Sequence, residues 1–142
     1  MKKIFASVLI IASTFTISCS QAPTSGEVKS VLGPAIEFEV TEHDFGTIPY
    51  GGNGIYEFEF TNSGTEPLIL SNVRSSCGCT VPQWPQQPIN PSEKASIKVK
   101  YDTNRPGKFN KSITVYSNAS ETPIMLYIKG TVQDKATAAA VE

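Results

Sequence analysis

The sequence predicts an all-β protein, an immunoglobulin-like sandwich of six or seven strands. Two observations lead to this fold class. Apolar residues alternate with polar ones along most of the chain, and clusters of turn-forming residues separate the alternating runs. No run has the spacing of an amphipathic helix, so two antiparallel sheets packed face to face are favoured. An open barrel with the same pattern is the alternative.

The predicted strands follow one another at short intervals. Alternation begins at residues 36–40 and 56–60, and a shorter apolar run covers residues 68–70. Because successive side chains of a strand point to opposite faces, one face of each run belongs to a core and the other to water. The remaining runs cover residues 95–101, 109–115 and 124–132, and the turn compositions between runs cover residues 51–54, 62–65, 104–107 and 117–120.

The first residues predict export. A basic start is followed by an uncharged, mostly apolar run over residues 4–17 that ends in small residues. The run is shorter than the roughly 20 apolar residues of a transmembrane helix, so residues 1–18 are predicted to be a cleaved signal peptide. Residues 16–19 resemble the lipobox of bacterial lipoproteins, in which Cys19 is the acylated residue, although Thr16 stands where an aliphatic residue is usual. Ordinary signal cleavage nearby is the alternative, and it would remove Cys19 or leave it as a stray thiol.

This leader sets the predicted organisation of the chain. Residues 19–34 read as a flexible tether, residues 35–132 as the sandwich domain and residues 133–142 as a disordered tail. Loss of two leader lysines leaves 12 − 2 = 10 basic against 13 acidic residues, a net charge of −3. No basic cluster stands out, which disfavours nucleic-acid binding. We expect an envelope protein, lipid-anchored to a bacterial membrane and facing the periplasm or the cell surface.

The strongest chemical feature is Cys77-Gly78-Cys79, a close cysteine pair in an exported chain. One interpretation is packing at a strand end or a passive disulfide. A second is thiol–disulfide exchange, because a bridge across a single residue is geometrically constrained and such bridges are easily reduced. A third is a soft metal such as Cu(I) or zinc, for which two thiolates supply half of the usual ligands and His43 is the only histidine available. The sequence does not place His43 near the thiols.

A proline-rich segment with the only tryptophan, Trp84, follows the cysteine pair at residues 81–88. Proline fixes the backbone and favours an extended loop. Trp84 at a surface would be an anchor for a binding partner. The favoured interpretation is that Trp84 folds back over the open end of the sandwich and covers the cysteines, because aromatic side chains are usually buried in small β cores.

Several motifs in order resemble a known family. They are Asp44-Phe45-Gly46-Thr47-Ile48, the stretch 58–64, the segment 75–80 around the cysteine pair, and residues 101–103 with 105–107. Together they resemble the bacterial exported domain-of-unknown-function family 1573 over residues 36–132, and the second half is distantly similar to hydin-like and major-sperm-protein-like modules. The resemblance implies a seven-stranded immunoglobulin-like sandwich used for binding or scaffolding, with no assigned catalytic activity.

The sequence therefore predicts a protein-binding or scaffolding module of the cell envelope that is not an enzyme. One histidine in the whole chain makes a hydrolytic triad improbable, and no cofactor is predicted. The expected partners are an unidentified envelope protein and, through Cys19, a membrane. The alternative function is that of a redox or soft-metal-handling accessory protein centred on Cys77 and Cys79.

Overall fold

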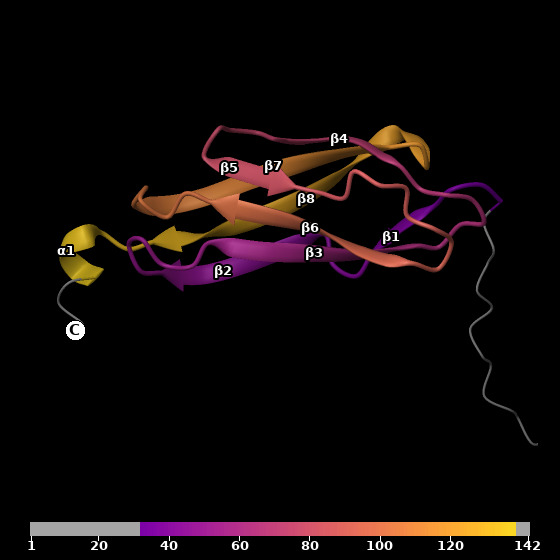
Figure 1. Cartoon of the computed structure of the whole chain (residues 1–142). Coiled ribbons are helices and arrows are strands. Elements are labelled where there is room, and N and C mark those ends of the chain that lie inside the picture. Colours follow the sequence, from indigo (N-terminus) through magenta and orange to yellow (C-terminus); the bar gives the residue numbers. More distant parts are fainter. Residues whose placement is uncertain (1–31, 139–142) are drawn as a thin grey trace, which may run out of the picture.

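The computed structural model describes residues 32–138, which form a β-sandwich (Figure 1). Two four-stranded sheets pack face to face. In strand order, the first sheet contains β1 (Ile36–Phe38), β3 (Ile55–Asn62), β6 (Lys94–Tyr101) and β5 (Thr80–Gln83), and the second contains β2 (Glu42–Ile48), β8 (Ser120–Val132), β7 (Gly107–Ser117) and β4 (Leu70–Ser75).

The all-β, immunoglobulin-like fold class predicted from the sequence is confirmed, and two details of the prediction change. The described residues contain eight strands, because Glu42–Ile48 and Thr80–Gln83 form strands beyond the six predicted runs. The N-terminal segment divides between the sheets. β1 pairs with β3 in the first sheet, and β2 pairs with β8 in the second. The chain crosses between the sheets without reversing, so β2 runs parallel to β8 while β1 runs antiparallel to β3. The sandwich is therefore not wholly antiparallel.

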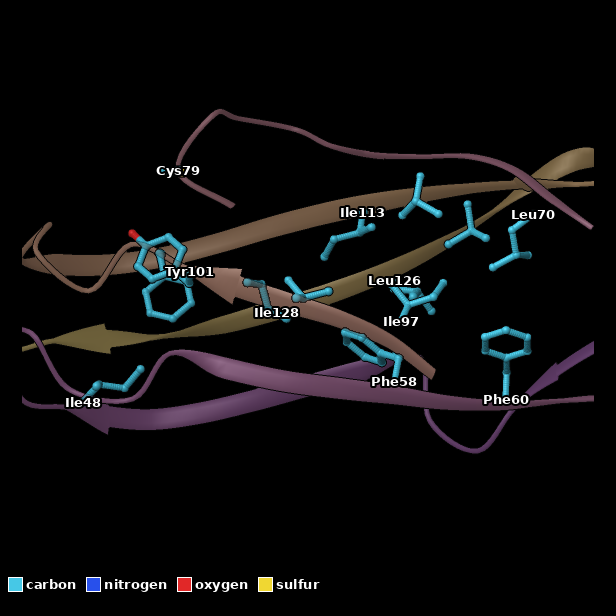
Figure 2. Close-up of a cluster of buried hydrophobic side chains, with 14 of the residues drawn as sticks. Ile48, Phe58, Phe60, Leu70, Cys79, Ile97, Tyr101, Ile113, Leu126 and Ile128 are labelled. Atoms are coloured by element: carbon cyan, nitrogen blue, oxygen red, sulfur yellow. The ribbon is translucent and has the colours of Figure 1, made fainter. Parts of the chain in front are cut away.

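The core lies between the sheets and consists of the inward residues of each alternating run (Figure 2). Phe58 of β3, Ile97 of β6, Ile113 of β7 and Leu126 of β8 are each 0 % exposed. Burial of one such side chain stabilises the fold by roughly 1.5–3 kcal/mol. The alternation read from the sequence thus supplies the main favourable term in folding.

Asn62, at the end of β3, is a buried polar side chain that holds three segments together. Its Nδ2 donates to the carbonyl oxygens of Glu66 at 2.8 Å and Ile89 at 2.9 Å. Its Oδ1 accepts from the main-chain N–H groups of Gly64 at 3.0 Å and Ala35 at 3.4 Å. The side-chain amide is fully hydrogen-bonded, which is what burial of a polar group requires.

The two ends of the sandwich differ in what they carry. The first described residues lie at one end, where Gly33 and Thr65 exchange main-chain and side-chain hydrogen bonds. The opposite end carries Cys79 and the end of β8 (Figures 1 and 2). Beyond β8, α1 (Lys135–Ala138) forms a single helical turn inside the segment predicted to be a disordered tail. Among residues 32–138 no helix is long and apolar enough to cross a membrane.

The signal peptide over residues 1–18, Cys19 and most of the tether over residues 19–34 lie outside the described residues. The last four residues of the chain do so too.

Candidate functional site

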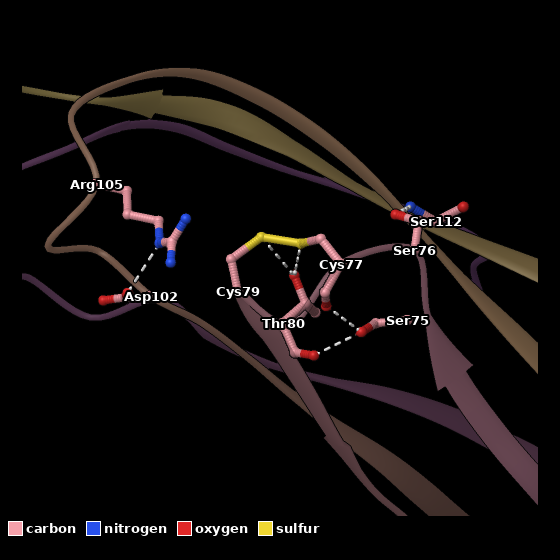
Figure 3. Close-up of a disulfide and its surroundings, with 8 residues drawn as sticks. All are labelled: Ser75, Ser76, Cys77, Cys79, Thr80, Asp102, Arg105 and Ser112. Carbon is pink, nitrogen blue, oxygen red and sulfur yellow. Dashed lines mark hydrogen bonds and ion pairs between the residues drawn. A yellow bond between two sulfur atoms is a disulfide. The ribbon is translucent and has the colours of Figure 1, made fainter.

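The cysteine pair forms a disulfide in the turn that connects β4 to β5 (Figure 3). The Cα atoms of Cys77 and Cys79 lie 5.3 Å apart, and one residue separates the two cysteines. Cys79 is 7 % exposed and belongs to the core cluster, whereas Cys77 is only partly buried at its edge. Gly78, between them, is exposed and has open space where a side chain would be. The two cysteine residues therefore differ in their exposure to solvent.

Hydrogen bonds other than the disulfide hold the turn in place. The Ser75 hydroxyl lies 2.5 Å from the carbonyl oxygen of Cys77 and 2.6 Å from that of Thr80, so its single proton is shared between acceptors at the two ends of the turn. The main-chain N–H of Asp102 donates to the carbonyl oxygen of Cys79 at 2.8 Å. The turn is thus fixed to the end of β6 as well as to β4.

The Thr80 hydroxyl lies beneath the disulfide. Its Oγ1 is 3.8 Å from the sulfur of Cys77 and 4.0 Å from that of Cys79, and Thr80 is 2 % exposed. Disulfide sulfurs carry no hydrogen, so in this state the hydroxyl is the donor. One buried hydroxyl therefore serves both sulfur atoms.

A cleft of about 540 Å³ opens beside Cys79. Its walls are the glycine-rich loop before β3, the disulfide turn and the end of β6. Thr103 holds the loop close, because its hydroxyl donates to the carbonyl oxygen of Gly52 at 2.8 Å and its own carbonyl accepts from Gly51 at 3.0 Å. A Cβ at Gly54 would come within 2.8 Å of the Tyr101 carbonyl oxygen, so the approach of the loop to β6 requires glycine there.

Charged groups lie at the rim of this cleft. Asp102 pairs with Arg105, whose Nε is 3.1 Å from a carboxylate oxygen. Hydrogen bonds from the main chain and side chain of Asn104 hold the pKa of the Asp102 carboxyl below its usual value. Lys100 contributes a second positive side chain to the walls. The cleft therefore combines a disulfide, a fixed loop and charges of both signs.

Trp84 does not lie over the cysteines. It follows β5, four residues beyond Thr80, and an extended strand of that length spans about 13 Å. Trp84 packs partly buried against the core, and its indole Nε1 is buried without a hydrogen-bond partner among the described residues. The prediction that Trp84 covers the cysteines was wrong, because residues 80–83 form a strand that carries the tryptophan away from them.

His43 is also distant from the cysteines. Its ring stacks on Tyr56 with centroids 3.6 Å apart and contacts Phe45 edge-on at 4.5 Å, between the two sheets. Burial lowers the pKa of His43, although the neighbouring Asp44 carboxylate opposes the shift. In the second sheet β8 and β7 lie between β2 and β4, a separation of about 14 Å at strand spacing.

The predicted ligand set of Cys77, Cys79 and His43 is therefore not assembled. Among residues 32–138 no three histidine, cysteine or acidic side chains come together as metal ligands.

The outer faces of the two sheets have different chemistry. The first sheet exposes acidic residues on β3 and lysines on β6, including ion pairs of Lys94 with Glu39 at 2.8 Å and of Lys98 with Glu57 at 3.0 Å. The second sheet exposes charged side chains over β2 and the adjoining ends of β7 and β8, where Lys129 pairs with Glu42. Over β4 and the neighbouring parts of β7 and β8 it exposes mainly uncharged side chains, and we call this part the neutral face. Its members are Asn72 and Arg74 of β4, Ser112, Thr114 and Tyr116 of β7, and Met125 and Tyr127 of β8.

The neutral face includes large side chains. Tyr116 is 39 % exposed, Met125 is 37 % and Tyr127 is 41 %. A concavity of about 440 Å³ beside them is lined by Ser71, Asn72, Arg74 and Tyr116. Arg74 has no ion-pair partner within residues 32–138, unlike Lys129 at the far side of the face, which pairs with Glu42.

Sequence reasoning found Cys77 and Cys79 but missed the groups around them. Thr80 directly follows the pair, so its position in the sequence was a signal for contact with the sulfurs. Asp102 and the loop at residues 51–54 are brought to the cysteines only by strand pairing, which no local pattern encodes.

The fold and this site define an immunoglobulin-like β-sandwich domain with a disulfide turn at one end. The chain belongs to the family described as "Protein of unknown function (DUF1573)", which it matches over residues 36–132. The search of curated proteins found no match.

Solved structures share the fold. A protein of unknown function from Porphyromonas gingivalis W83 is 17% identical with a TM-score of 0.59, over 69% of this chain and 46% of that chain. This chain thus spans less than half of that protein. The PapD-like domain 7 of human CEP192 is 10% identical with a TM-score of 0.60, over 86% of this chain and 99% of that one.

Part of an enzyme also has this fold. A family 123 glycoside hydrolase from Clostridium perfringens is 14% identical with a TM-score of 0.52, over 70% of this chain and 27% of that one. Identities this low establish the common architecture and carry no activity across.

Proposed function

We propose that this protein is a non-enzymatic, protein-binding module of the bacterial cell envelope, exported and anchored by lipid at Cys19. The leader and the lipobox-like residues support export and acylation. In this proposal the tether joins the domain at the Gly33 end. β3 separates that end from the disulfide by roughly 24 Å, so an anchored domain would present the disulfide end away from the membrane.

The observation that carries the binding role is the contrast between the outer face of the first sheet, which we call the charged face, and the neutral face. On the charged face, Lys94 pairs with Glu39 and Lys98 with Glu57, as is usual for a solvated surface. The neutral face instead exposes Tyr116, Met125 and Tyr127 among small polar side chains. Tyrosine and methionine are enriched in protein interfaces, and lysine and glutamate are depleted. The neutral face is therefore the docking surface in this proposal.

The occupant that fits this surface is an extended, acidic segment of a partner protein. β4 is an edge strand, since it pairs only with β7, and its outer main-chain groups are available for an added strand. The other edges are less suitable: β1 has three residues, β5 contains Pro82 and β2 is irregular between Asp44 and Thr47. A carboxylate on the added segment would complement the guanidinium of Arg74.

Site-specific photocross-linking in the native cells tests the docking surface. A photoreactive residue replaces Tyr116 in the full-length chain, and a second variant carries it at Glu59 on the charged face. We expect a defined cross-linked protein from position 116 only, and its loss on Arg74→Glu but not on the control Lys100→Glu. Equal cross-linking from both faces, or insensitivity to Arg74→Glu, would refute the proposal.

The anchor has its own test. Cells that express the wild-type chain or Cys19→Ala are labelled with a fatty acid, and we expect label only in the wild type. Equal labelling would remove the anchor and leave the docking surface untouched.

The redox alternative also has support, whereas the metal alternative has lost its ligand set. Two sulfurs bonded to each other are not thiolate ligands, and His43 lies on another strand. Cys77 is only partly buried, a buried hydroxyl donor lies near both sulfurs, and a cleft opens beside Cys79.

A further inference from the structure

The disulfide turn has features that a passive bridge would not need. We propose that Cys77–Cys79 exchanges with the thiols of a dithiol, that Cys77 is the sulfur attacked, that Cys79 is the sulfur that leaves, and that Thr80 positions and stabilises the leaving sulfur. This inference rests on the redox alternative and is independent of the neutral face, so either proposal can fail alone.

Access decides which sulfur is attacked. Exchange requires a thiolate to reach a disulfide sulfur, and its rate depends on which sulfur is open. Cys79 is 7 % exposed and lies within the core cluster, whereas Cys77 lies at the margin of that cluster beside the exposed Gly78. The incoming thiolate therefore meets Cys77 first.

The Thr80 hydroxyl can stabilise the buried Cys79 thiolate that forms when Cys77 is attacked. When Cys79 leaves as a thiolate, its burial penalises the negative charge. The Thr80 hydroxyl already lies 4.0 Å from the Cys79 sulfur and can strengthen its hydrogen bond as charge develops there. The same hydroxyl lies 3.8 Å from the Cys77 sulfur, so it can also stabilise Cys77 when that sulfur leaves in the second step.

The turn is built to survive opening of the bridge. Ser75 and Asp102 hold the carbonyl groups of Cys77 and Cys79 by hydrogen bonds that do not involve sulfur. The two thiols therefore remain close after reduction, and reclosure remains an intramolecular reaction.

The exchange proceeds in two steps. A thiolate of the dithiol attacks the Cys77 sulfur and forms a mixed disulfide, while the Cys77–Cys79 bond breaks and its electron pair goes to Cys79. The second thiol of the dithiol, deprotonated, then attacks the mixed disulfide and releases Cys77 as a thiolate. The dithiol becomes a disulfide, the protein gains two electrons, and the two protons of the dithiol end on Cys77 and Cys79.

Trapping the mixed disulfide tests the polarity. The folded, purified protein is exposed briefly to reduced glutathione, remaining thiols are alkylated, and peptide mass spectrometry locates the glutathione. We expect it on Cys77 at least about tenfold more often than on Cys79, and equal labelling when the protein is unfolded in urea. Glutathione mainly on Cys79, or no preference in the folded protein, would overturn the assignment.

Two threonine variants test the role of the hydroxyl. We expect Thr80→Val to slow reduction by dithiothreitol about tenfold, as the loss of one hydrogen bond to a charged sulfur predicts, and Thr80→Ser to stay within about twofold of the wild type. Thr61→Val, a matched change on β3 of the first sheet, should have no effect. Thermal melts identify folded variants. Should Thr80→Val fail to fold, the glutathione mapping is repeated in Thr80→Ser instead. Unchanged reduction of folded Thr80→Val, or loss of the Cys77 preference in Thr80→Ser, would contradict the proposal.

Discussion

Replacing Asn62 by alanine should destabilise the domain by about 4 kcal/mol. The change removes three short hydrogen bonds, at 2.8, 2.9 and 3.0 Å, each with a net value of about 1 kcal/mol. It also leaves the buried N–H of Gly64 without its acceptor, which costs about 1 kcal/mol more. Domains of this size are stable by only about 5–15 kcal/mol, so the loss is a large fraction of the total.

Urea denaturation followed by circular dichroism measures this change, with the fluorescence of Trp84, the only tryptophan, as a second probe. The control is Asn110→Ala, because Asn110 is exposed on β7 and its side chain makes no hydrogen bond within the described residues. We expect the control to change the free energy of unfolding by less than about 0.5 kcal/mol. A loss below about 1 kcal/mol for Asn62→Ala would refute the assignment of Asn62 as the link between segments.

Three further changes have defined outcomes. Gly54→Ala should destabilise the fold by about 1–3 kcal/mol in urea denaturation, because the added methyl group would overlap the Tyr101 carbonyl oxygen; a neutral effect would show that the loop is not tightly packed. The lowered pKa of His43 means that the unfolded chain binds this proton more readily, so the free energy of unfolding should fall as the pH drops below the unfolded-state pKa of about 6.5. His43→Gln should flatten this dependence between about pH 7 and 5. An identical pH profile in the variant would contradict the assignment. Lys98→Ala should cost less than about 1 kcal/mol, because the pair with Glu57 is exposed, and a larger loss would mean that the charged face is structural.

The sequence predicted the core well because side-chain alternation is a local pattern. Phe58 and Phe60 alternate with glutamates in β3, and the structure buries the aromatic pair completely. The same reasoning located the interiors of β6, β7 and β8, and the predicted turns lie between strands. A period of two fixes which side chains face inward once a strand exists.

The pattern could not say which sheet a strand joins. The segment before residue 48 divides between the sheets at a crossing after Phe38, and this crossing makes β2 a separate strand that pairs in parallel with β8. β5 was missed because Pro82 suggested a loop, yet an edge strand tolerates proline. Strand partners are long-range information, and for that reason the cleft and the neutral face were not predictable either.

The stability of the fold and the stability of the disulfide depend on each other, because folding and bridge formation are thermodynamically coupled. A bridge across one residue closes a loop so short that chain entropy accounts for only about 1.6 kcal/mol of stability, compared with about 3 kcal/mol for a loop of about 15 residues. The amount by which the bridge stabilises the fold equals the amount by which the fold stabilises the bridge. Because the fold stabilises the bridge only slightly, Cys77–Cys79 stays nearly as reducible as in the unfolded chain, as an exchange site requires.

Comparison of the oxidised and reduced wild-type protein in urea measures this coupling without any substitution. We expect the free energies of unfolding to differ by less than about 2 kcal/mol and both forms to unfold cooperatively. A difference of about 4 kcal/mol or more would mean that the fold holds the bridge closed. The disulfide would then be a structural staple, and the exchange proposal would lose its thermodynamic basis while the docking surface on β4 and β7 would stand.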